Sequence, residues 1–183
     1  VRAEFHPAAE GWEHELVITP RMAFGTGHHA TTRMMVQAML DLDLRGQNVC
    51  DLGCGTAVLA ILAERLGAAH VLGIDNDEQA VINARENMAM NHCERIIVEK
   101  GDAGLLKPLA YGTILANIER NTLVHAMSEM HDALLPGGMM LLSGFVQGDI
   151  GRMTEAIEHV GLRRVSVLEE GEWAMVGCRK LRQ

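Results

Sequence analysis

The sequence predicts an α/β domain built on a Rossmann-like, seven-stranded sheet that is mostly parallel and ends in an antiparallel hairpin. Three observations predict it. Short apolar runs alternate with helix-forming segments, a glycine-rich turn follows the first apolar run, and the last two apolar runs stand too close together for a helix to join them. Alternation of strand and helix at this rhythm is typical of a parallel sheet covered on both faces.

Five apolar runs are interpreted as the parallel strands. In chain order they are Asn48–Leu52, Val71–Ile74, Arg95–Glu99, Thr113–Ala116 and Met139–Ser143. The helices predicted to follow them are Ala57–Leu66, Glu78–Met90, Asn121–Leu135 and Ile150–Val160. Apolar residues at helical spacing support the second helix, and Gly67, Pro136 and Gly161 mark helix ends.

The end of the chain breaks this alternation. Leu162–Leu168 and Trp173–Arg179 both favour strands, and only Glu169–Glu172 separates them. Four residues cannot hold a crossover helix, so the two strands are predicted to form an antiparallel hairpin.

Composition excludes several classes of protein. Lys and Arg number 16 against 24 Asp and Glu, a formal charge of −8, and the longest basic run before the C-terminal tail is Arg163-Arg164. Phosphate binding needs clustered cations, so no direct nucleic-acid partner is expected. No apolar run approaches the roughly 20 residues of a membrane span. The four cysteines form no CxxC pair and the histidines no HxxxH pair. We therefore expect buried thiols, no metal site and a cytoplasmic protein.

The first strand leads into the turn Asp51-Leu52-Gly53-Cys54-Gly55. Glycines at such a turn let the backbone bend and let a ligand approach closely. Asp75 ends the second strand, where a carboxylate can accept both ribose hydroxyls of a nucleotide. A glycine turn without a ligand remains the alternative.

The residues around this turn favour S-adenosylmethionine over a dinucleotide. Val58 stands where a dinucleotide site needs a third small residue, and the Asp51 carboxylate would repel a pyrophosphate. S-adenosylmethionine has a ribose, an ammonium and a sulfonium but no phosphate, so it fits this loop better.

Two further strand ends carry candidate site residues. Asp102-Ala103 follow the third strand, where the carboxylate could accept the adenine amino group and the next amide could reach a ring nitrogen. An acid that only closes a turn is the alternative. Asn117 ends the fourth strand, where open sheets place reacting groups; a helix N-cap is its alternative.

Together these residues resemble class I S-adenosylmethionine-dependent methyltransferases. The segment Ala23-Phe24-Gly25-Thr26-Gly27-His28-His29-Ala30-Thr31-Thr32, the turn at Gly53 and the segment Ala116-Asn117-Ile118 are similar to motifs of the PrmA family. The resemblance covers about residues 15–180. Glu119-Arg120 depart from the small and apolar residues that usually follow in that family.

The resemblance implies both an activity and a set of site residues. PrmA enzymes methylate lysine side chains and the α-amino group of ribosomal protein eleven of the large subunit. Cofactor contacts carry over to Thr32, Gly53, Asp75 and Asn117, and Phe24 and Thr26 would belong to a loop over the methionine end of the cofactor. Asn117 is the candidate catalytic residue, which would orient the amine. With Asp51, Gly55, Asp102 and Ala103, these residues form the expected site.

The expected domain organisation is a lead-in segment of residues 1–22 and a catalytic domain of residues 23–183. An N-terminal domain that grips the ribosomal protein is expected to be absent from this chain. Three alternative functions stay open. They are a protein-lysine methyltransferase for another target such as a flavoprotein subunit, a nicotinamide-dependent oxidoreductase, and a binding module without catalysis.

Overall fold

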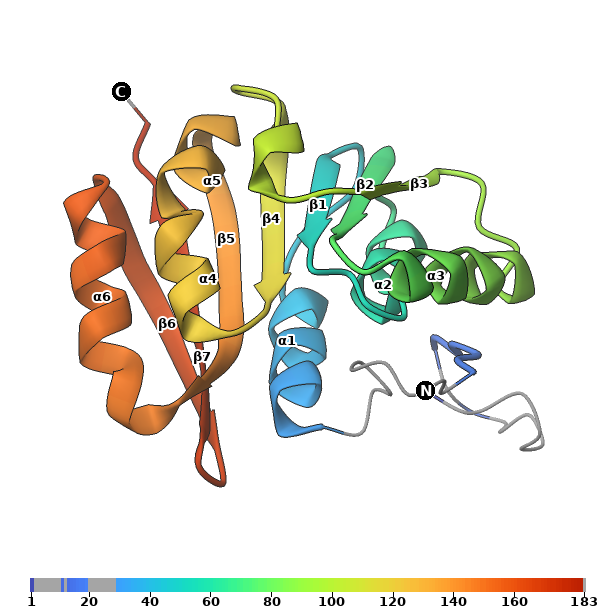
Figure 1. The fold of residues 1–183 in the computed structure, drawn as a ribbon, viewed down its shortest axis with the longest axis horizontal. Coiled ribbons are helices and arrows are strands. Elements are labelled where there is room, and N and C mark those ends of the chain that lie inside the picture. Colours follow the sequence, from blue (N-terminus) through green and yellow to red (C-terminus); the bar gives the residue numbers. More distant parts are fainter. Residues whose placement is uncertain (2–10, 12, 20–28, 183) are drawn as a thin grey trace.

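A computed structural model describes residues 1, 11, 13–19 and 29–182. Its centre is a seven-stranded sheet in the order β3-β2-β1-β4-β5-β7-β6 (Figure 1). The strands are β1 (Asn48–Leu52), β2 (His70–Asp75), β3 (Ile96–Lys100), β4 (Tyr111–Asn117), β5 (Leu134–Val146), β6 (Leu162–Glu170) and β7 (Trp173–Lys180). The α-helices are α1 (Ala30–Leu40), α2 (Val58–Arg65), α3 (Glu78–Met90), α4 (Arg120–His125), α5 (Met127–Ala133) and α6 (Ile150–His159).

The sheet has the predicted mixed topology. Strands β1 to β5 pair in parallel, whereas β7 runs antiparallel between β5 and β6. Only Gly171 and Glu172 separate the last two strands, so the predicted hairpin is confirmed with a tighter turn. Because β1 lies between β2 and β4, the chain leaves β1 at the point where the strand order reverses. Open sheets form a ligand crevice at that point.

Helices cover both faces of the sheet (Figure 1). On one face α1, α2 and α3 enclose a core that includes Met35, Ile61 and Leu115. On the other face α4, α5 and α6 pack over residues such as Leu123, Met130 and Phe145. The central strands are thus buried on both sides, which explains their nearly continuous apolar sequences.

Three parts of the chain differ from the sequence prediction. The single helix predicted over Asn121–Leu135 is two short helices, α4 and α5, separated at Ala126, and Leu134 already belongs to β5. Strand β5 is therefore much longer than the predicted Met139–Ser143, because a register shift in its pairing with β4 accommodates Pro136 and its neighbours. Helix α1 was not predicted at all.

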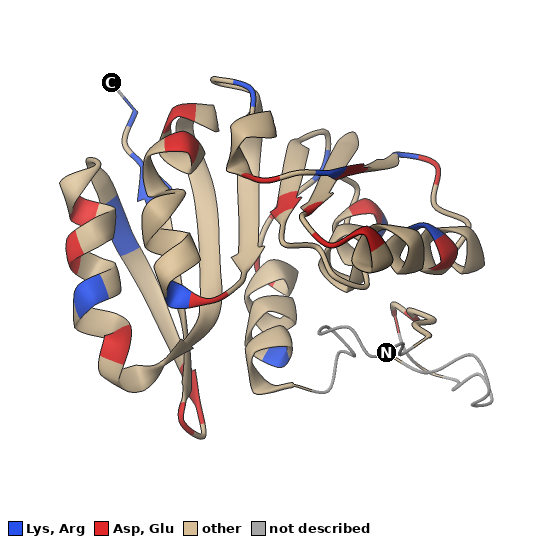
Figure 2. Ribbon diagram, viewed as in Figure 1, with Lys and Arg blue, Asp and Glu red and all other residues tan. Residues whose placement is uncertain are grey.

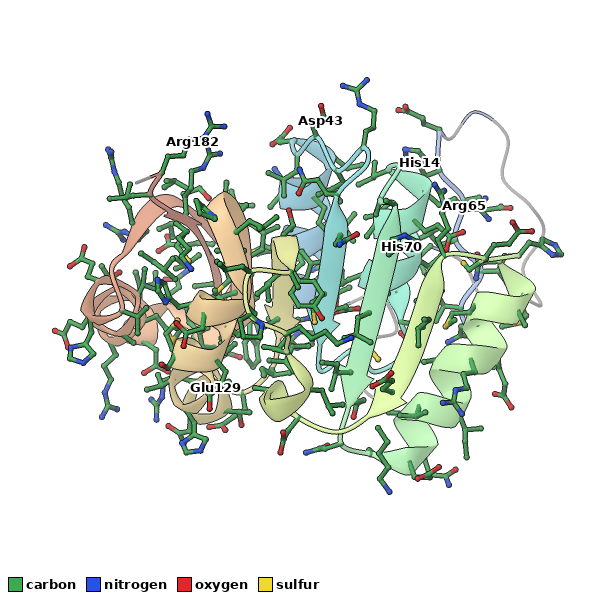
Figure 3. All side chains as sticks on the ribbon, turned by 90° about the horizontal axis from the view of Figure 1, so that it is seen from above. His14, Asp43, Arg65, His70, Glu129 and Arg182 are labelled. Carbon is green, nitrogen blue, oxygen red and sulfur yellow. The ribbon has the colours of Figure 1, made fainter. Side chains whose placement is uncertain are left out.

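The N-terminal segment 13–19 lies along α3. The Asn91 side chain donates to the Val17 carbonyl and accepts from the Val17 amide, and the Asn87 Oδ1 accepts from the Thr19 amide at 2.9 Å. In Figure 3, His14 of this segment and Arg65 of α2 are labelled on the same side of the sheet. The segment is therefore tied to the domain by side-chain amides, and Val17 also forms an isolated β-bridge.

The cysteines match the expectation of buried thiols in three of four positions. Cys50, Cys54 and Cys178 are buried, Cys93 is half-buried, and all four are free. Within the described part of the chain, no helix is both long and apolar enough to cross a membrane. The same residues contain no cluster of three or more His, Cys, Asp or Glu side chains that could hold a metal ion.

Candidate active site

A cavity of about 820 Å³ opens at the carboxyl ends of the parallel strands. It is bordered by the glycine turn after β1, the end of β2, the loop after β3, the junction from β4 to α4, and the starts of α1 and β7. The predicted site residues that line it are Thr32, Asp51, Gly53, Gly55, Asp75, Asp102, Ala103 and Asn117. The structure therefore brings together every predicted site residue that it describes. Phe24 and Thr26, with the rest of their loop, lie outside the described residues.

The glycine turn has the backbone that its sequence predicts. Gly53 and Gly55 have φ angles of +73° and +52°, a region that side chains with a Cβ rarely adopt. The amides of Gly53 and Cys54 both donate to the Ile74 carbonyl, at 2.7 and 3.0 Å. A Cβ at Gly53 would collide with the Ile118 side chain, so this position needs glycine for protein packing as well as for ligand access.

Asp75 links the end of β2 to the glycine turn. Its Oδ2 accepts from the Gly55 amide at 2.8 Å and its Oδ1 accepts from the Asp77 amide at 3.0 Å. Each carboxylate oxygen keeps a further lone pair, so Asp75 can still accept hydroxyl donors from the cavity.

Asp51 is the deepest carboxylate of the cavity, at 1% exposure. Its Oδ2 accepts from the Ala60 amide at 3.0 Å, whereas its Oδ1 has no hydrogen-bond partner. Burial raises the pKa of Asp51 to about 7, and the nearby charge of Asp75 acts in the same direction. A buried acceptor without a partner is costly, and a cation in the cavity would satisfy it.

Asn117 lies at the end of β4, and its Nδ2 donates to Thr32 Oγ1 of α1 at 3.3 Å. The N-cap of α4 is Glu119, so Asn117 does not cap that helix and the alternative from sequence is excluded. Thr32 is 1% exposed. Two predicted site residues from distant parts of the chain thus contact each other directly.

Asp102 closes a turn, as its alternative interpretation stated, and also borders the cavity. Its Oδ1 accepts from the Gly104 amide at 2.9 Å and caps a short 3₁₀ helix, Ala103–Leu105. Capping occupies only Oδ1, so the other carboxylate oxygen of Asp102 can accept a hydrogen bond from a ligand in the cavity.

Sequence reasoning quoted His29 in the motif before α1 but did not foresee that it forms a wall of the cavity with Trp173. Their rings meet edge to face with centroids 4.8 Å apart, and both residues line the cavity. His29 is the N-cap of α1, and its side chain accepts from the Thr31 amide. Trp173 was predicted only as the first residue of the last strand. The wall exists because β7 inserts beside β5, which a local pattern does not reveal.

The described lining of the cavity carries six carboxylates and neither Lys nor Arg. The acids are Asp51, Asp75, Asp77, Asp102, Glu119 and Glu129. Figure 2 shows acidic segments at the ends of β1 and β2 and where the chain passes from β4 to α4. Such a lining favours cationic ligands and disfavours phosphates. Cys54 also lines the cavity, but burial raises the pKa of its thiol and keeps it protonated.

Comparison with protein families gives a match over almost the whole chain. The family model described as ribosomal protein L11 methyltransferase (PrmA) matches residues 4–181. A relative named ribosomal protein L11 methyltransferase from Porphyromonas gingivalis is 47% identical over 175 residues, which are 95% of this chain and 60% of that protein. The protein of the same name from Deinococcus radiodurans is 38% identical, over 90% of this chain and 64% of its own length. The chain thus spans less than two thirds of these relatives.

Solved structures agree on the fold. The ribosomal protein L11 methylase of Lactobacillus delbrueckii subsp. bulgaricus superimposes with a TM-score of 0.87 at 23% identity, covering 97% of this chain and 92% of that one. An S-adenosylmethionine-dependent methyltransferase from Mesorhizobium loti gives a TM-score of 0.71 at 18% identity, covering 85% of this chain and all of that one. At these identities the likeness establishes the class I methyltransferase fold.

Proposed function

The chain belongs to the PrmA family of ribosomal protein L11 methyltransferases, and from that premise we propose that it transfers methyl groups from S-adenosylmethionine to ribosomal protein L11. The proposed acceptors are lysine side chains and the α-amino group. The observation that carries the proposal is the unpartnered Oδ1 of Asp51 in a cavity whose described lining has no Lys or Arg. That lining suits a ligand with an ammonium and a sulfonium.

The residues present fit the cofactor. Asp75 would accept the ribose hydroxyls, and the free oxygen of Asp51 would face the ammonium of the methionine end. The backbone of Gly53 and Gly55 would leave room for that end, because neither residue carries a Cβ. Asp102 and Ala103 would border the adenine. Thr32 would support the donor side through its contact with Asn117.

When bound, S-adenosylmethionine supplies an electrophilic methyl group on its sulfonium. The protein then has to present a neutral amine in line with that group. A free lysine has a pKa near 10.4, so the site must desolvate the amine or accept its proton. The amide oxygen and backbone carbonyl of Asn117 are the groups we assign to orienting the amine. Correct positioning can supply much of the rate without a dedicated base.

We assign residues 23–183 to the catalytic domain and residues 1–22 to a lead-in segment. Every strand and helix that the structure describes falls within residues 30–180, which supports this division. We place the reaction in the cytoplasm, since the proposed substrate is a ribosomal protein.

The direct test is incubation of this chain with methyl-labelled S-adenosylmethionine and purified ribosomal protein L11. We expect label on L11, and mass increments that map to lysines and to the N-terminal amine. Label on a flavoprotein subunit but not on L11 would move the assignment to the first alternative. A rise in melting temperature with a nicotinamide cofactor, and none with S-adenosylmethionine, would reject methyl transfer altogether.

A further inference from the structure

One side of the cavity is not used by the cofactor contacts proposed above. It is formed by the end of the β4 segment and by the helices α4 and α5. The lining residues there are Ile118, Glu119, Thr122, His125, Ala126 and Glu129. Figure 3 labels Glu129 on α5. A substrate side chain that reaches Asn117 can enter along this side, because Asn117 lines the same cavity.

Glu119 stands two residues beyond Asn117 on a stretch of backbone that is held in place. The Ile118 amide donates to the Ser143 carbonyl at 3.1 Å. Gly144 packs so closely on Ile118 that a Cβ there would collide with the Ile118 backbone. The carbonyl of Glu119 accepts from the Leu123 amide at 3.1 Å and so begins α4. The backbone that carries Glu119 is therefore held in place two residues beyond Asn117.

The charge of Glu119 is left available to the cavity. Its next neighbour, Arg120, pairs instead with Asp149 of the segment before α6, at 2.7 Å, and does not line the cavity. The hydrogen bond recorded for the Glu119 side chain comes from the neutral hydroxyl of Thr122, at a long 3.3 Å. Among the residues that the structure describes, no ion pair is recorded for Glu119 or Glu129. Most of the lone pairs of the Glu119 carboxylate thus remain free to accept.

A second observation points independently to a cation in this cavity. Asp51, which lines the same cavity, is buried and has an oxygen without a partner. Asp51 is almost fully buried beside the glycine turn, whereas Glu119 is exposed to solvent at the start of α4. The cavity is thus suited to two positive groups, one held deep and one entering from solvent.

We propose that Glu119 is a specificity-determining residue that receives the ammonium group of an incoming lysine at the rim of the cavity and guides it to Asn117. The inference rests on the proposed function and names a part of the acceptor site. The lysine arrives protonated, so a carboxylate near its path raises its local concentration and its rate of association. No bond to Glu119 forms or breaks. Glu119 therefore acts on binding and not on the chemical step.

Replacement by Glu119→Gln keeps the size and hydrogen-bonding capacity of the side chain and removes its charge. We expect KM for a lysine-containing substrate to rise about three- to tenfold, with kcat within about twofold of wild type. The difference should shrink at high salt, because exposed charges are screened. Glu119→Asp should restore most of the affinity. Cofactor affinity should not change in either variant.

The matched control is Glu158→Gln, since Glu158 is exposed on α6 and does not line the cavity. It makes the same change in net charge at a distant site. The binding probe is a fluorescent peptide that copies a lysine-containing segment of L11, measured with S-adenosylhomocysteine present. A second peptide carries norleucine in place of the lysine. Wild type and Glu158→Gln should prefer the lysine peptide, and Glu119→Gln should lose the preference.

The peptide-binding assay tests the role of Glu119, and the methylation assay with L11 tests the proposed substrate. Equal affinity of wild type and Glu119→Gln for the lysine peptide overturns the role of Glu119, and so does a wild type that does not distinguish the two peptides. A failure of wild type to methylate L11, with the peptide preference intact, counts against the proposed substrate and leaves the role of Glu119 supported. A variant with unchanged KM but reduced kcat would show that Glu119 acts in the chemistry, contrary to the proposal.

Discussion

The amide of Gly55 donates a hydrogen bond of 2.8 Å to Oδ2 of Asp75, which joins the glycine turn after β1 to the end of β2. One carboxylate thus fixes the shape of the turn while it faces the cavity. Its two roles are separable by experiment, because one acts on the apo protein and the other only on the ligand complex.

We expect Asp75→Ala to weaken S-adenosylmethionine binding by about 2–3 kcal/mol, because it removes a charged acceptor from two ribose hydroxyls. Isothermal titration calorimetry measures this directly. Asp43→Ala, at a position outside the cavity, is the control and should bind like wild type. Unchanged affinity in Asp75→Ala would place the ribose elsewhere.

Substitution of Gly53 should lower the stability of the protein before it affects ligand binding. The sequence alone predicts that a side chain here fills the space of the cofactor. The structure adds a collision with Ile118 and a positive φ. We expect Gly53→Ala to lower the melting temperature, and Ile118→Ala to recover part of the loss when the two are combined. A double-mutant cycle by urea unfolding measures this coupling; strictly additive losses would show that Ile118 is not the obstacle.

Asp51 should make stability depend on pH. Its pKa is raised to about 7 by burial, above the usual value of 3.8, so the native state holds a proton that the unfolded state releases. The contribution of Asp51 to the free energy of unfolding is therefore fully present below pH 4. It is lost as the pH rises toward 7. We expect Asp51→Asn to be more stable than wild type at pH 8, by roughly a few kcal/mol, with a smaller gap at pH 5. The same variant should bind S-adenosylmethionine more weakly at pH 8. Thermal melts at both pH values give the first result, and a gap that is independent of pH would contradict it.

Local patterns predicted the strands because β1 to β4 are short, apolar and closed by a turn or an acid. They failed for α1, because its N-cap is His29 rather than a common capping residue and its C-cap is Asp41 rather than glycine. Its buried Met35 and Met39 become meaningful only against the far half of the sheet. The same holds for the site. Asp75 and Asn117 end predicted strands and could be found from the sequence. Trp173 lines the cavity only because β7 pairs with β5, which local patterns do not reveal.

Trp173 should report ligand binding. It lines the cavity, and the other tryptophan of the sequence is Trp12. We expect S-adenosylhomocysteine to change the tryptophan emission of wild type, and the Trp12→Phe variant to keep the change. Trp173→Phe should abolish it while the protein still binds. Binding seen by calorimetry without any change in emission from the Trp12→Phe variant would place the ligand away from β7.

Two asparagines of α3, one turn apart, should respond oppositely to substitution. Asn87 is fully buried; its Nδ2 donates to the Thr56 carbonyl next to the glycine turn and its Oδ1 accepts from the Thr19 amide, both at 2.9 Å. Asn87→Ala removes both of these hydrogen bonds from a fully buried position, so we expect a loss of about 2–3 kcal/mol. Asn83 is equally buried, but neither atom of its amide has a partner.

Asn83→Leu should therefore be neutral or stabilising, because it replaces a desolvated polar group by an apolar one of similar size. Urea unfolding of the two variants beside wild type decides the matter. Only Asn87→Ala should also weaken S-adenosylmethionine binding, since it alone touches the glycine turn. A large loss of stability in Asn83→Leu would indicate that its amide is satisfied by a buried water, which makes several hydrogen bonds and is costly to remove. Equal losses of stability in the two variants would show that the hydrogen bonds of Asn87 do not account for its effect.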